Sequence, residues 1–174
     1  TEIVTSFGAE ISAAAATDRV DVLRKWIDLD VLLRTFVVDR AIAHDDGPLH
    51  WYCRQGCAPH NFYWYEEPEA NRLHLIPWDL DGAFQNFTTP SPYTTIADGW
   101  GEITNECKPF AHEALNLLQR SAACDPLLGT LLASDALYQQ KRADFLAGPF
   151  SAERVNEQLD IWIAQIGPLV EEAA

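Results

Sequence analysis

Four residues in the middle of the sequence carry side chains of the kind that phosphoryl transfer requires. Asp46 follows an apolar stretch, Asn61 opens an aromatic stretch, and Asp79 comes directly after a second apolar stretch, with Asp81 close behind it. Phosphoryl transfer needs hard oxygen ligands for metal ions and a carboxylate that orients or deprotonates the attacking hydroxyl. We therefore expect these groups to meet around a single magnesium ion.

Hydrophobic spacing predicts the elements that must hold these residues. Asp18 is expected to cap a helix, and a second, buried helix is expected to end at residues 44–48. An aromatic strand and an apolar strand, joined by turn residues, predict a hairpin that delivers Asp79 and Asp81. In chain order, the expected elements are a helix over 18–27, a buried helix over 31–42, a loop over 47–60, and hairpin strands over 62–65 and 73–76.

The rest of the chain is expected to be linker, loop and helix. Residues 1–16 end in an alanine run and predict a leading strand and linker, whereas residues 85–106 predict a long loop. Apolar positions three and four apart predict helices afterwards, with Ser151 capping the last one. These helices are expected over 110–121, 126–133, 135–146 and 151–170. The predicted fold is mostly α with a short embedded β-hairpin, organised as a leading segment over 1–17 and one domain over 18–174.

The composition is globular but strongly acidic. Of the 174 residues, 48% are apolar and 22% are charged, which suits one domain with a sizeable core. The 26 acidic residues outnumber the 12 basic ones and give a net charge of -14. This charge disfavours nucleic acid and anionic membrane surfaces as partners and suits divalent cations. No apolar run is long enough to span a bilayer. Because methionine is absent, we expect a processed chain or one part of a longer protein.

Four cysteines fall into two locally spaced pairs. Cys53 with Cys57 and Cys107 with Cys124 predict two disulfides in an oxidising compartment, so a secreted or periplasmic location is the first interpretation. Free thiols and a zinc site in the 47–60 loop are the alternatives for the first pair. The four ligands of such a zinc site would be His50, Cys53, Cys57 and His60.

Three stretches resemble the signature of the CotH kinase family, which is typified by spore-coat kinases and also occurs in secreted and cellulosomal bacterial proteins. They are residues 38–47, which end in Asp-Asp-Gly, residues 60–65 (HNFYWY) and residues 75–82 (LIPWDLDG). The resemblance implies a protein-kinase-like C-lobe of α+β type with ATP and Mg²⁺ (or Mn²⁺) as cofactors. It also implies phosphoryl transfer to Ser or Thr of a protein substrate, at an extracellular, cell-surface or periplasmic location.

The resemblance also implies a role for each of the four residues. Asp46 would be the catalytic aspartate that receives or positions the proton of the substrate hydroxyl, with Asp45 as a rival. Asn61 and Asp79 would bind the metal beneath the phosphates of the nucleotide, in the order in which protein kinases present these groups. Asp81 would share or replace the role of Asp79 as a metal ligand.

Neighbouring residues have structural interpretations. Asp39 and Arg40 predict an ion pair in the buried helix. The aromatic stretch 62–65 predicts packing of the hairpin against that helix, with stacking on adenine as the alternative. Trp78 is interpreted as a core residue rather than a ligand contact.

The sequence departs from a complete kinase in two respects. The 47–60 loop is longer than is usual in the family. A kinase also needs an N-terminal lobe with a lysine on the α- and β-phosphates, but none of Lys25, Lys108 and Lys141 lies in a Gly-rich, strand-rich leader. We therefore expect the N-terminal lobe to be missing from this chain and transfer to be inactive without it. The alternative function is a non-catalytic metal-binding or scaffold module derived from a degenerate or split kinase lobe.

Overall fold

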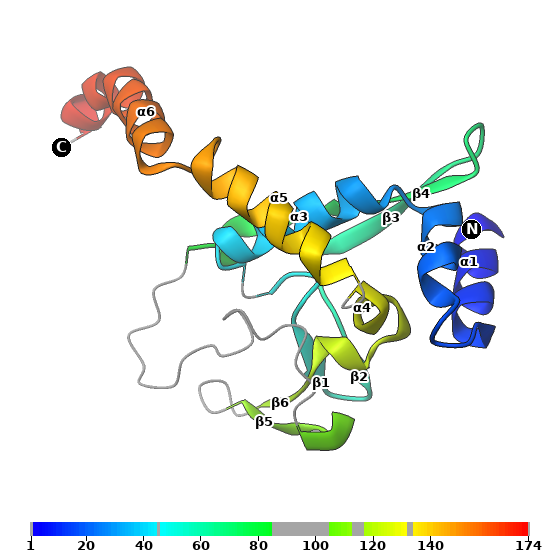
Figure 1. Cartoon of the computed structure of the whole chain (residues 1–174). Coiled ribbons are helices and arrows are strands. Elements are labelled where there is room, and N and C mark those ends of the chain that lie inside the picture. Colours follow the sequence, from blue (N-terminus) through cyan, green and yellow to red (C-terminus); the bar gives the residue numbers. More distant parts are fainter. Residues whose placement is uncertain (1, 45, 85–104, 113–116, 132–133, 174) are drawn as a thin grey trace. The chain divides into compact units, whose positions relative to one another are not determined.

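The computed structural model describes residues 2–44, 46–84, 105–112, 117–131 and 134–173 (Figure 1). The chain divides into two compact units, Thr1–Asp135 and Ala136–Ala174, and each is described by itself. The expected long loop over 85–106 lies outside the described residues except at its last two positions. Those positions belong to the short 3₁₀ helix η3 (Asn105–Cys107).

The first unit begins with two packed helices, α1 (Glu2–Ala13) and α2 (Arg19–Trp26) (Figure 1). The predicted leading strand is therefore wrong. Phe7 and Ile11, four residues apart, lie on one face of α1 and are buried, which is the spacing of a helix that covers a core. The predicted helix over 18–27 is confirmed as α2. Asp18 occupies its N-cap position, although its side chain makes no hydrogen bond to the first turn of the helix. The proposed boundary between 1–17 and 18–174 stays a prediction.

The buried helix is confirmed as α3 (Leu29–Ala41). Its N-terminus is capped by Asp28, whose carboxylate accepts hydrogen bonds from the backbone N–H groups of Asp30 at 3.0 Å and Val31 at 3.2 Å. Leu33 and Phe36 are completely buried and anchor the helix in the core. This fixed helix ends just before the segment that carries Asp46.

The predicted hairpin is confirmed as β3 (Phe62–Glu67) and β4 (Arg72–Pro77). The two strands are antiparallel and paired from Phe62 opposite Pro77 to the turn. Leu73 on β4 is almost fully buried and also forms a parallel bridge with Ile27, which joins the hairpin to the end of α2. The hairpin is therefore anchored on one face, as an isolated two-stranded ribbon would not be.

A second sheet replaces two predicted elements. It has the antiparallel order β2-β1-β6-β5. The predictions of a loop over 47–60 and a helix over 110–121 are therefore wrong at these positions. The backbone of β6 pairs with β1 on one side and β5 on the other, so tertiary pairing overrides the local apolar spacing. The strands are β1 (Trp51–Cys53), β2 (Cys57–Ala58), β5 (Phe110–His112) and β6 (Leu117–Arg120).

Both predicted disulfides are present. Cys53 and Cys57 are register partners in β1 and β2, and their bond closes the tight turn between these strands. Cys107 bonds to Cys124, a sequence separation of 17, and this bond ties η3 to η4 (Ala122–Cys124). The zinc and free-thiol alternatives for the first pair are thereby excluded in this structure, because both sulfur atoms are used.

Helices complete the two units. The predicted helix over 126–133 is seen as α4 (Pro126–Leu131), and residues 132–133 lie outside the described part. The last two helices are confirmed as α5 (Asp135–Ala147) and α6 (Ala152–Ala173), with Ser151 Oγ 3.4 Å from the backbone N–H of Arg154. Within the described residues, no helix is both long and apolar enough to cross a bilayer. The whole is mostly helical with two small antiparallel sheets, compatible with an α+β fold.

A pH-dependent contact joins α1 to α2. The Glu10 carboxylate accepts hydrogen bonds from Lys25 Nζ and from Trp26 Nε1, both at 2.7 Å. These bonds, that of Lys25 first, lower the pKa of Glu10. A carboxyl whose pKa is lower in the folded state adds stability above its unfolded pKa, and this stability is lost as the pH falls through the folded pKa.

We therefore expect Glu10→Gln to lower the melting temperature at pH 7, and the difference from wild type to shrink as the pH falls below the ordinary value of 4.5. Thermal unfolding followed by circular dichroism over a pH series measures this. Glu69→Gln, which removes an exposed charge in the β3–β4 turn, serves as the control. A difference for Glu10→Gln that did not change with pH would contradict the electrostatic explanation.

Candidate functional site

The open end of the β3–β4 hairpin brings Asn61 and Asp79 together. The backbone N–H of Trp78 donates to the carbonyl of Asn61 at 3.0 Å, one position beyond the last ladder pair. Asn61 and Asp79 both adopt the left-handed conformation, with φ of 50° and 55°. Asn and Asp tolerate this region better than other non-glycine residues. The hairpin therefore ends in two sharp bends, and each bend carries one of the predicted metal ligands.

Asp46 joins this end of the hairpin through Asn61. The Asn61 Nδ2 atom donates to Asp46 Oδ2 at 2.9 Å, and His60 Nδ1 lies 3.7 Å from the other carboxylate oxygen of Asp46. This hydrogen bond orients the amide of Asn61 and leaves its Oδ1 atom as the one that could ligate a cation. The rival residue, Asp45, lies outside the described residues.

Asp79 and Asp81 form a carboxylate pair beside Asp46. The pKa of Asp79 is raised from its ordinary value by partial desolvation, then by the charge of Asp81, by a hydrogen bond with Asp81 and by the charge of Asp46. His44 acts in the opposite direction. The negative charges of Asp81 and Asp46 thus make ionisation of Asp79 harder, as like charges in one site do. A cation placed among them would relieve this repulsion.

A buried pair that the sequence analysis did not identify lies behind the carboxylates. His44 Nδ1 is 2.9 Å from Asp39 Oδ1, and His44 Nε2 is 3.2 Å from the backbone carbonyl oxygen of Asp79. The side chains of His44 and Asp39 are 0% and 5% exposed. The only signal in the sequence was a polar pair five residues apart at the end of an apolar helix. Its partner across the fold, 35 residues further on, could not be read from local spacing.

Asp39 has a side-chain partner that the sequence analysis did not name, His44, whereas its predicted pairing with Arg40 stays a prediction. Burial raises the pKa of Asp39, and the hydrogen bond from His44 opposes this change, with a smaller effect of the Arg40 charge. The hydrogen bond with Asp39 raises the pKa of His44 in turn. The contact between Asp39 and His44 thus links α3 to the loop that leads to Asp46.

The aromatic residues of the hairpin divide between its two faces. Trp64 packs edge-on against Phe7 of α1 with ring centroids 6.1 Å apart, whereas Tyr63 and Tyr65 are 57% and 55% exposed. The predicted contact of the hairpin with α3 is made by β4, whereas the aromatic strand β3 packs against α1 and exposes its two tyrosines. Trp78 is 45% exposed and lies against Tyr63, so its interpretation as a core residue is wrong.

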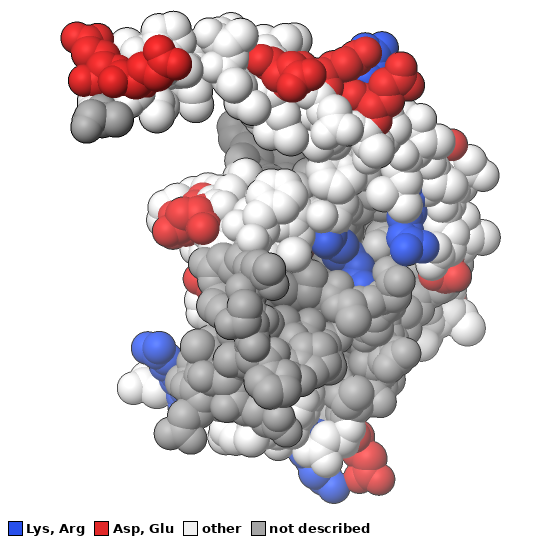
Figure 2. All heavy atoms as spheres, turned by 90° about the vertical axis from the view of Figure 1, so that its left-hand side faces the viewer, with Lys and Arg blue, Asp and Glu red and all other residues white. Residues whose placement is uncertain are grey.

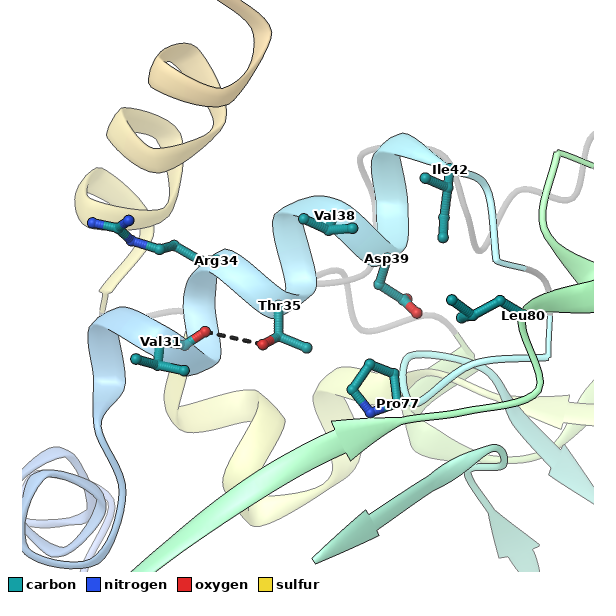
Figure 3. Close-up of a pocket in the computed structure, with 8 residues that line it drawn as sticks. All are labelled: Val31, Arg34, Thr35, Val38, Asp39, Ile42, Pro77 and Leu80. Atoms are coloured by element: carbon teal, nitrogen blue, oxygen red, sulfur yellow. Dashed lines mark hydrogen bonds between the residues drawn. The ribbon is translucent and has the colours of Figure 1, made fainter. Parts of the chain in front are cut away.

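An apolar pocket of about 310 Å³ lies next to the carboxylates, between α3 and the end of β4 (Figure 3). Figure 3 shows Leu80, which separates Asp79 from Asp81 in the chain, pointing toward the side of α3 that carries Asp39. The site thus has a polar side formed by carboxylates and an apolar side formed by α3. The lining residues are Val31, Arg34, Thr35, Val38, Asp39, Ile42, Pro77 and Leu80.

The oxygen donors at this end of the hairpin are of the chemical type that a hard divalent cation prefers. Asp46, Asn61, Asp79 and Asp81 offer carboxylate and amide oxygens, which are the ligands that Mg²⁺ prefers. The raised pKa of Asp79 shows that the carboxylates lie close enough to repel one another. Over the described residues, no three or more His, Cys, Asp and Glu side chains are arranged so that they could hold a metal ion by themselves. A cation at this site would therefore need Asn61 Oδ1 in addition to the carboxylates.

The charge of the surface agrees with this chemistry. On the face shown in Figure 2, Asp and Glu cover more of the coloured surface than Lys and Arg do, in line with the net charge of -14. A surface of this sign attracts cations and repels polyanions.

Gly47 packs directly against the buried pair of Asp39 and His44. A Cβ atom at this position would lie 2.5 Å from Asp39 Oδ1 and 2.6 Å from His44 Nδ1. We expect Gly47→Ala to lower the free energy of unfolding by about 1–3 kcal/mol, because the overpacked pair must separate. Urea denaturation measures this. The control is Gly56→Ala, where an added Cβ atom would meet no heavy atom within 4 Å. If the two substitutions lowered the free energy of unfolding equally, close packing of Gly47 against Asp39 and His44 would be unimportant for stability.

Comparison with known proteins assigns the chain to a family. No curated protein and no solved structure gave a significant match. The chain does match the family described as CotH kinase protein, over residues 2–174. The match includes both units and all four residues of the predicted site. Because it covers essentially the whole sequence, this chain belongs to the CotH kinase family, a membership that indicates a kinase-like function.

Proposed function

We propose that this chain is the catalytic-lobe part of an ATP- and Mg²⁺-dependent kinase that phosphorylates Ser or Thr of secreted or surface proteins. The observation that supports the proposal is that three segments carrying polar groups come near one another at the open end of the hairpin. Asp46 bonds to Asn61 at one end of the hairpin, and the other strand of the hairpin leads to Asp79, whose pKa responds to Asp46 and Asp81. Family membership supports the kinase-like part of this proposal.

Each residue has a defined task in this mechanism. Asp46 accepts or orients the proton of the substrate hydroxyl, and its bond to Asn61 fixes the direction of its carboxylate. Asn61 Oδ1, Asp79 and Asp81 hold the cation, either Mg²⁺ or Mn²⁺. When bound, the metal would neutralise the charge that develops on the transferred phosphoryl group. The sequence and the structure leave Asp79 and Asp81 as joint candidates for the main ligand.

The nucleotide-binding half of the site is proposed to come from elsewhere in a longer protein. Lys25 is paired with Glu10 and Lys108 with Glu106, and Lys141 belongs to α5 of the second unit. Neither Lys25 nor Lys108 is therefore placed to hold the α- and β-phosphates, as a kinase requires. This observation also favours the second candidate function, a metal-binding or scaffold module without catalysis.

The two disulfides support an oxidising location for the protein. Cytosolic thiols are usually kept reduced, so a chain with both of its cysteine pairs bonded fits an extracellular, cell-surface or periplasmic setting. Protein substrates would be met in the same compartment. A source of ATP in that compartment, or phosphorylation before export, is a requirement of the proposal.

Asp46→Asn and Asp79→Asn should each reduce phosphoryl transfer by about 100-fold or more, because each removes a charge that the transition state needs. Transfer of ³²P from labelled ATP to protein, measured with the full-length protein, gives the readout. Asp81→Asn tests which carboxylate dominates. Asp160→Asn on α6 is the control and should retain full activity.

The outcomes separate the two candidate functions. Retained transfer in both Asp46→Asn and Asp79→Asn would overturn the assignment of the site. Binding of Mg-ATP without transfer by the full-length wild-type protein would favour the scaffold function.

A further inference from the structure

Both ring nitrogens of His44 lie within hydrogen-bond distance of oxygen atoms, and these two contacts determine the orientation of the ring. A carbonyl oxygen can only accept a hydrogen bond, so His44 Nε2 must donate to the backbone of Asp79. The proton between His44 Nδ1 and Asp39 Oδ1 completes the second contact at 2.9 Å. Both side chains are buried, so water does not compete for the bond between them. Asp39 therefore sets the orientation of the ring, and the ring in turn holds Asp79.

The backbone that His44 holds is in an unfavourable conformation. Asp79 has φ 55° and ψ 55°, the left-handed region that non-glycine residues rarely adopt, and its side chain does not cap the following helix η1 (Leu80–Gly82). Such a conformation persists when surrounding contacts determine it. The hydrogen bond from His44 is one of these contacts.

A second hydrogen bond fixes the other end of the same segment. The backbone N–H of Phe84 donates to the carbonyl of Ile42 at 2.7 Å. Residues 79–84 are therefore held at both ends by residues 42–44, immediately after α3. The direction of the Asp79 and Asp81 carboxylates thus depends on the C-terminal end of α3 and not on the hairpin alone.

We propose that Asp39 and His44 form a buried positioning pair that aims the Asp79 carboxylate at the cation site by holding its backbone carbonyl. This inference rests on the proposed function, in which Asp79 is a metal ligand. Neither Asp39 nor His44 touches the metal or the substrate. Their contribution is the orientation of a ligand, of the kind that outer-shell partners supply in metal sites.

Two amide substitutions of the same buried residue test the proposal. In His44→Gln the side-chain amide reaches the place of Nε2 and can still donate to Asp79, whereas in His44→Asn it reaches only the place of Nδ1, facing Asp39. Mn²⁺ alone is the probe, and its affinity for the full chain is measured by calorimetry and by the electron paramagnetic resonance of free Mn²⁺. We expect affinity to fall by about 10-fold or more in His44→Asn. We expect His44→Gln to stay within about 3-fold of wild type, because the bond to Asp79 is kept.

A matched control separates positioning from general loss of stability. His50 is also buried, and its partner is the hydroxyl of Tyr52. His50→Asn should lower the melting temperature to a similar degree as His44→Asn but leave Mn²⁺ affinity unchanged. If His44→Asn does not fold, His44→Phe fills the space of the ring without a donor and replaces it in the comparison with His44→Gln.

The outcomes also separate this inference from the proposed function. Asp79→Ala should abolish Mn²⁺ binding at this site. If it does, but His44→Asn and His44→Gln bind Mn²⁺ equally well, the positioning role is overturned and the metal site stands. If Asp79→Ala binds Mn²⁺ as wild type does, the metal site is wrong and the positioning proposal falls with it.

Discussion

The register of one hairpin is the constraint on which the candidate site depends. Because Phe62 pairs with Pro77, the next residues outward, Asn61 and Trp78, meet through the backbone, and Asp79 follows at once. Side chains alternate along a strand, so a slip of one residue would turn these groups to the opposite face. The burial of Leu73 against the core prevents such a slip. Ordinary core packing thus determines where the polar groups lie.

The buried pair of Asp39 and His44 lies in an environment of lower dielectric constant than the exposed carboxylates. Asp79 and Asp81 are exposed to solvent, which screens their charges. Asp39 and His44 are buried, and the low dielectric around them strengthens the hydrogen bond that they share. A flexible, solvated carboxylate loop would bind a cation but would hold no fixed geometry. The buried pair supplies this geometry from the end of α3, a helix whose Phe36 is completely enclosed by the core.

The second sheet shows how long-range contacts override local preference. The apolar spacing in residues 110–121 fits a helix as well as a strand, and β6 becomes a strand because β1 and β5 supply partners on both sides. β1 lies about 65 residues earlier in the chain, so no local pattern could reveal this partner. The Cys107–Cys124 bond brackets the same region and holds its ends together. Strand formation here is a tertiary outcome.

The sequence by itself determined the elements with strong periodicity and the order of the chemical groups. The buried helix α3, the hairpin, α5, α6, both disulfides and the resemblance to the family were all predicted, because each depends on spacing within a short window. Tertiary structure alone decided that residues 2–13 form a helix within the first unit, that β1 and β6 pair, and that His44 reaches Asp79. These results depend on partners far along the chain, and local spacing carries no information about such partners.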